Sequence, residues 1–305
     1  MNFLMKISHN AIRFLFLCVV SFVLTVPWAR ADVTFIHEVE AEDLFTGKKV
    51  LTVTTSYRSD GMYMDQKRQY TGSWMRLLFG GVRQDRRTVL ISLASQDIRE
   101  VDWGRDKCRI FPLARLKDPA WIHSLEKRRE EYQPLMAERY EVRPAELSIA
   151  ADQPQETLGK YHCRRISARL WEDTFDRLRG AHSITEVQQE LWLSDDVPGI
   201  EEGAQVHRQL GAALGLEVER FGPLSFLLSY WQGSLAPLAR DLEKVRGYPV
   251  KSTVRVTAHY IPKEGESKKV SRVINKESSI LKEVIPAVDG GLYEVPSHFT
   301  TVRVP

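Results

Sequence analysis

The sequence predicts an α+β fold built around an antiparallel sheet. The main observation is the alternation of apolar and polar residues. In residues 250–260, Val250 and Val254 share one parity, whereas Lys251 and Arg255 hold the other. This pattern is typical of a strand with one buried and one wet face, which antiparallel sheets allow. Short polar turns separate successive strand patterns, as in meanders, and helical patterns are fewer.

Strand patterns dominate the chain from residue 33 onward. They are expected at residues 33–39, 50–57, 62–64, 88–93, 98–103, 108–113, 187–193 and 250–260. Polar turns at 59–61, 95–97 and 104–106 separate neighbours in this series. Connections this short favour strands that pair with their sequence neighbours.

Besides the apolar segment at 221–231, three helical regions are expected between the strands. Asp118-Pro119 supplies an N-cap acid and a proline at the first helical position, and Pro134 should end that helix near Tyr132. Residues 203–214 form a second helical pattern. A third follows Gly233-Ser234, with Leu235, Leu238, Leu242 and Val245 on one stripe that is typical of core packing.

Residues 221–231 (FGPLSFLLSYW) are apolar on nearly every side. Eleven residues are too few to cross a bilayer, which takes about 20. A helix that is apolar all round must be buried against protein or ligand. We therefore select four residues as candidates to line an apolar ligand cavity: Phe226, Leu227, Tyr230 and Trp231.

The first 31 residues have the pattern of a signal peptide. Lys6 and Arg13 give a positive start, residues 14–28 form an apolar run, and Ala29-Arg30-Ala31 offers a small-x-small cleavage site before Asp32. We expect residues 1–31 to be removed and residues 32–305 to form one α+β domain. The compartment expected is the periplasm. An uncleaved anchor and lipidation at Cys18 are the alternatives.

Composition restricts the partners of the mature chain. The full chain has 43 basic and 40 acidic residues, and three of the basic ones lie in residues 1–31, so the mature chain is neutral. A neutral chain has no general field for nucleic acid. With the signal removed, no membrane-spanning segment is expected.

Cys108 and Cys163 remain after removal of the signal. An even pair in an oxidising compartment favours a disulfide. Two buried thiols, or one reactive thiol, are the alternatives.

No motif of a known catalytic or metal site is found in the chain. It lacks the G-x-S-x-G, H-E-x-x-H, C-x-x-C and phosphate-loop patterns. Asp195-Asp196 follows a strand pattern and precedes Val197-Pro198-Gly199, which indicates a turn rather than a carboxylate pair. The sequence therefore favours a protein that is not an enzyme and needs no cofactor or metal.

Six ordered segments resemble an exported bacterial family of unknown function. They are residues 86–91 (RRTVLI), 106–113 (DKCRIFPL), 156–163 (ETLGKYHC), 190–199 (ELWLSDDVPG), 247–251 (GYPVK) and 292–296 (LYEVP). The fold of that family is similar to the LolA/LolB-type lipoprotein carriers. The resemblance implies a strongly curved antiparallel sheet, a half-barrel, wrapped around buried helices.

The resemblance and the apolar segment lead to one main functional hypothesis. It is a non-enzymatic exported protein that binds a lipid or other hydrophobic ligand in an apolar cavity between sheet and helices. A structural or interaction module of the cell envelope with a self-filled core, and envelope proteins as partners, is the alternative. A third hypothesis is an enzyme with dispersed catalytic residues.

Overall fold

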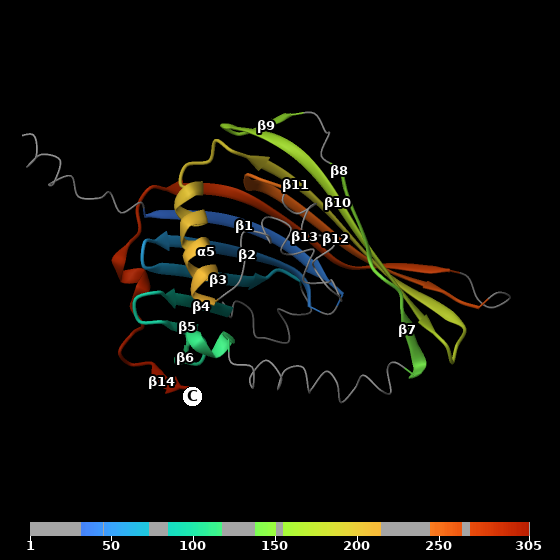
Figure 1. The fold of residues 1–305 in the computed structure, drawn as a ribbon, viewed down its shortest axis with the longest axis horizontal. Coiled ribbons are helices and arrows are strands. Elements are labelled where there is room, and N and C mark those ends of the chain that lie inside the picture. Colours follow the sequence, from blue (N-terminus) through green and yellow to red (C-terminus); the bar gives the residue numbers. More distant parts are fainter. Residues whose placement is uncertain are drawn as a thin grey trace, which may run out of the picture. The chain divides into compact units, whose positions relative to one another are not determined.

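Residues 32–305 form one compact unit dominated by a single large sheet. The computed structural model describes residues 32–44, 46–72, 85–117, 138–150, 155–214, 245–263 and 269–304. Figure 1 shows the long strands β10 to β13 running together and the helix α5 lying across the strands that come first in the chain. The expected dominance of strands is confirmed.

The N-terminal part of the chain supplies six strands and a short 3-10 helix. They are β1 (Val33–Asp43), β2 (Gly47–Arg58), β3 (Gly61–Tyr70), β4 (Asp85–Ser92), β5 (Asp97–Asp102), β6 (Lys107–Pro112) and η1 (Leu113–Lys117). The six strands overlap the six that alternation predicts here. Their tight turns use left-handed backbone at Gln96 (φ 51°) and Asp106 (φ 47°), which polar residues of this kind tolerate better than branched ones.

Among the described residues, the C-terminal part adds four long strands (β10 to β13), four short ones and the helix α5. The strands are β7 (Tyr140–Val142), β8 (Glu146–Ala150), β9 (Glu156–Leu158), β10 (Tyr161–Asp176), β11 (Ala181–Ser194), β12 (Tyr248–Ile261), β13 (Val270–Ile285) and β14 (Thr300–Arg303), and the helices are α5 (Ile200–Leu214) and η5 (Gly290–Tyr293). The expected strands at 187–193 and 250–260 and the helix at 203–214 are confirmed. The expected helix at 118–132 lies outside the described residues. Most of the third helical region does too, but Val245 at its expected end is described and is not helical.

The strand order is β14-β6-β5-β4-β3-β2-β1-β13-β12-β11-β10-β7, and β8 and β9 also pair with β10. Neighbours in this order are antiparallel, except that β14 pairs parallel with β6. The sheet is therefore mixed, with its two halves joined where β1 pairs with β13.

The helix α5 packs on one face of the sheet, which we call the helix face. It is the face that carries Phe35, His37 and Tyr57. The hydroxyl of Tyr57 lies 3.0 Å from Nε2 of His207 on α5. A Cβ added at Gly203 of α5 would lie only 3.3 Å from the Tyr57 ring, so the absent side chain lets helix and sheet approach closely.

The predicted half-barrel wrapped around buried helices, the LolA-like part of the fold, is wrong. In the ranges that the structure describes, the fold is one large mixed sheet, and α5 is the one long α-helix. It is a surface helix, because Glu201, Gln205 and Arg208 are exposed while Val206 faces the sheet. Strand alternation reveals which face of a strand is apolar, but not which element covers that face.

The opposite face of the sheet has its own core beside the C-terminal segment. Tyr63, Leu90, Val101 and Cys108 are buried there together with Phe299. Tyr293 donates its hydroxyl to the backbone carbonyl of Ser56, 3.1 Å away. The segments 86–91, 106–113 and 292–296 all contribute to this packing, so these parts of the resemblance have a structural role.

Candidate functional site

The four residues selected from the sequence to line a ligand cavity lie outside the described residues. They are Phe226, Leu227, Tyr230 and Trp231. Ala31, on one side of the expected cleavage site, is likewise outside them, whereas Asp32 is the first described residue. In the described part of the chain, no helix is long and apolar enough to cross a membrane.

The expected Cys108–Cys163 disulfide is absent, because both cysteines are free thiols. Cys108 lies on β6 and Cys163 on β10, and the strand order places eight strands between these two. A disulfide needs Cα atoms within about 7 Å. Both side chains are 1% exposed, and burial raises the pKa of each thiol. The structure therefore favours the alternative of two buried, unreactive cysteines.

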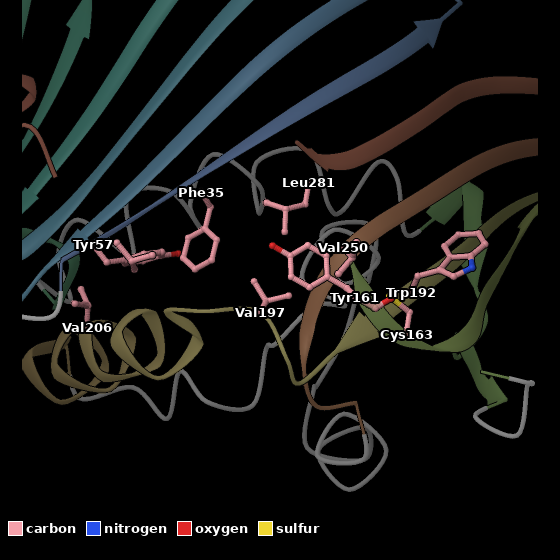
Figure 2. Packing of buried hydrophobic residues seen from close by; sticks show 10 residues of the cluster. Phe35, Tyr57, Tyr161, Cys163, Trp192, Val197, Val206, Val250 and Leu281 are labelled. Carbon is pink, nitrogen blue, oxygen red and sulfur yellow. The ribbon is translucent and has the colours of Figure 1, made fainter. Parts of the chain in front are cut away.

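Two apolar clusters meet on the helix face. The aromatic cluster, seen from close by in Figure 2, contains Phe35, Tyr57, Tyr161, Val250 and Leu281 among its ten residues. Phe35 stacks on the ring of Tyr248 with centroids 4.3 Å apart. These contacts join strands that are far apart in sequence.

The second cluster is aliphatic, and we call it the valine–leucine cluster. It consists of Ile166, Ala168, Leu170, Val187, Leu191, Leu193, Val245, Val254 and Val256. Every member is at most 5% exposed. All but Val245 come from β10, β11 and β12. Strand β12, which alternates most regularly in the sequence, contributes Val254 and Val256.

A group of polar side chains lies between the two clusters. On β12, Ser252 is on the same face as Val250 of the aromatic cluster and Val254 of the valine–leucine cluster. Ser252 is the direct cross-strand partner of Ser279 on β13. The amide nitrogen of Gln189 on β11 donates to Oγ of Ser252 over 3.3 Å. We call the group Tyr248, His37, Ser279, Ser252 and Gln189 the polar stripe.

His37 is the centre of the polar stripe. Its Nε2 lies 2.9 Å from the hydroxyl of Tyr248, and its Nδ1 lies 3.2 Å from Oγ of Ser279. A neutral imidazole has one donor and one acceptor nitrogen, and hydroxyl groups can satisfy both. The bonds thus hold the ring in place whichever tautomer it adopts.

Burial keeps the polar stripe uncharged. Desolvation lowers the pKa of His37 to about 4 and raises the pKa of Tyr248 well above its usual value. Both groups are therefore neutral over the physiological range. Nearby on β13, burial also raises the pKa of Glu277, although Lys49 opposes this shift. The arrangement offers hydrogen bonds in apolar surroundings without a fixed charge.

None of these polar residues was a candidate site residue from the sequence, although two of them stand at positions that indicate a buried polar group. His37 occupies the same strand parity as Val33, Phe35 and Val39, and Ser252 occupies that of the β12 valines. A polar residue at an apolar position of an alternating strand must be hydrogen-bonded once it is buried. Tyr248 and Gln189 were harder to find, because their partners come from distant parts of the chain.

Comparison with known proteins assigns no function. No family model matches the chain, and no curated protein matches it. Among solved structures, a DUF1329 family protein from Desulfovibrio piger covers 91% of this chain and 94% of its own, with 7% identity and a TM-score of 0.17. These comparisons show neither a family nor a LolA-like fold for this chain.

Proposed function

We propose that this protein is a non-enzymatic binding protein for a hydrophobic ligand with an uncharged polar headgroup. The observation that carries the proposal is the hydrogen-bonded chain Tyr248–His37–Ser279 between two apolar clusters. Small-molecule sites are typically apolar surfaces with a few polar groups that fix orientation. The polar stripe and its two flanking clusters have this composition.

The neutrality of the polar stripe defines the class of headgroup. A charged headgroup next to His37 would lose its hydration without gaining an opposite charge, which is strongly unfavourable. An ester, amide or alcohol can exchange hydrogen bonds with the imidazole and the hydroxyls of Tyr248 and Ser279. The acyl chain of such a ligand would gain about 0.8 kcal/mol for each methylene group that it buries.

A direct test compares two lipids with the same acyl chain, a monoacylglycerol and a fatty acid. The full chain should bind the neutral monoacylglycerol more tightly, as measured by competition with a fluorescent acyl probe. His37→Leu removes the central hydrogen bonds and should weaken monoacylglycerol binding about tenfold, which corresponds to roughly 1.4 kcal/mol. His162→Leu is the matched control, because His162 is exposed and bonds only to Thr157 in the described residues.

The second candidate is the structural or interaction module with a self-filled core. It is favoured by the low exposure of the valine–leucine cluster, whose residues already cover one another. Native mass spectrometry after mild purification separates the two. Absence of bound lipid, together with no binding of either acyl compound, would support the structural module and contradict the binding protein. Unchanged affinity in His37→Leu would contradict the role of the polar stripe.

A further inference from the structure

A second feature of the helix face is a cavity of about 280 Å³ over strands β3 to β6. Its floor includes the apolar side chains of Met64 and Val89. Register places it on the helix face. His37 pairs with Val53, and the row continues through Gln66 and Arg87 to Asp102 and Lys107 without a bulge. Residues directly opposite one another in a sheet share a face.

The lining of this cavity is basic. Arg87, Arg105, Lys107 and Arg109 line it, against the two acidic residues Glu100 and Asp102. Arg105 lies 3.8 Å from Asp102, and Arg87 lies 3.5 Å from Asp85 outside the cavity. Both arginines are more than half exposed, so these pairs are weak.

Lys107 and Arg109 are not neutralised in the same way. Within the described ranges, neither forms an ion pair at 4.0 Å or less. Arg109 is the cross-strand partner of Glu100, and Lys107 is that of Asp102. Each of these two cross-strand pairs has opposite charges, yet neither pair is close enough to form an ion pair in the described residues. The two cations on β6 therefore remain available to a ligand.

We propose that this cavity binds a phosphate monoester group. Four basic side chains against two acidic ones leave an excess of positive charge that suits a dianion. Guanidinium groups match phosphate oxygens in paired hydrogen bonds, and lysine adds a compact positive charge. The volume lies at the lower end of small-molecule sites and suits a headgroup rather than a whole lipid. The inference is independent of the neutral site at His37, which lies five strands away from Lys107 in the sheet.

The test uses the double variant Lys107→Ala, Arg109→Ala in the full chain. Inorganic phosphate binding is measured by calorimetry, and lipid binding by sedimentation with phosphatidylcholine vesicles with and without phosphatidic acid. Phosphatidic acid supplies the same phosphate monoester on a lipid. The wild-type protein should bind one or both phosphate sources, and the double variant should bind at least about tenfold more weakly. Binding to the vesicles alone would identify a lipid headgroup as the ligand.

A matched control removes the same charge elsewhere. Arg272→Ala, Lys276→Ala changes two basic residues of β13, which is six strands from β6 in the sheet order. This control should retain phosphate binding. Arg87→Gln, on a different strand, provides a second test should the β6 variant fail to fold. Equal weakening by both double variants, or no binding of either phosphate source by the wild-type protein, would overturn the proposal.

Discussion

At His37, folding buries an imidazole where its neutral form is favoured over its charged form. The two hydroxyl partners satisfy both ring nitrogens, and the surrounding apolar residues exclude water from the ring. The ordinary histidine pKa of 6.5 falls to about 4 as a result. Because the unfolded chain restores the ordinary value, this residue links the stability of the protein to pH.

The sign of this linkage can be stated for His37. Between pH 6.5 and about 4, the unfolded chain binds a proton at position 37 that the folded chain does not. The free energy of unfolding should therefore fall as the pH is lowered through this interval, by at most about 3 kcal/mol from His37. His37→Gln cannot titrate and should lack this contribution. Urea unfolding of both proteins at neutral and mildly acidic pH measures the difference.

The pH dependence of stability must be compared between the wild-type protein and His37→Gln, because other buried groups also titrate. Burial lowers the pKa of His207 and raises the pKa of Glu277, and these shifts change stability with opposite signs. Both groups are present in the wild-type protein and in His37→Gln, so their contributions cancel in the difference. Equal loss of stability on acidification in the two proteins would contradict the prediction.

Among the elements, α5 depends on small residues for its position. Gly199, just before the helix, has φ +84°, and a Cβ there would lie 2.3 Å from Cγ2 of Val33. The helix thus begins against the first residue of β1. The sequence showed Gly199 as part of a turn, but its contact with Val33 is a property of the folded chain.

A pair of glycine substitutions tests this docking. Gly199→Ala and Gly47→Ala both place a side chain at a positive φ, but a Cβ at Gly47 has nothing within 4 Å. Both variants should lose about 1 kcal/mol from backbone strain. Gly199→Ala should lose about 1–3 kcal/mol more, because Val33 must move in a packed core. Thermal unfolding measures both losses, and equal losses would show that the contact with Val33 is not limiting.

For the whole molecule, the compact unit starts at Asp32, the residue that follows the expected signal cleavage site. This boundary supports our proposal that residues 1–31 are removed on export. Strand β1 begins at Val33 and pairs on both sides, with β2 and with β13. A cut before Asp32 would leave all of β1 within the mature protein.

The export proposal has a simple test. Protein isolated from the cell-envelope fraction of the producing organism should have the intact mass of residues 32–305. The unprocessed chain should unfold at the same temperature as a chain expressed from Asp32, because the sheet begins after the cut. A mass that retains residues 1–31 would contradict cleavage and favour the uncleaved anchor.

Sequence patterns alone were sufficient to predict β1 to β6, β11, β12 and the helix α5, whereas β7 to β10, β13 and β14 were not among the expected strands. Alternation along β1 to β6, β11 and β12 is a local property, because neighbouring side chains point to opposite faces. The buried positions Val250, Val254 and Val256 could be predicted from it. The polar stripe could be predicted only in part, from His37 and Ser252 at apolar positions of their strands. The basic cavity could not be predicted from the spacing of residues.

The order of the strands in the sheet, and the side chains that this order brings together, could be learned only from the folded chain. The pairing of β1 with β13 joins residues more than two hundred positions apart, and no local pattern encodes such a contact. It brings Ser279 to His37, and it places eight strands between the two cysteines that their even number had suggested were bonded. Long-range pairing depends on the complementarity of whole strand faces, so it emerges only when the complete sheet forms.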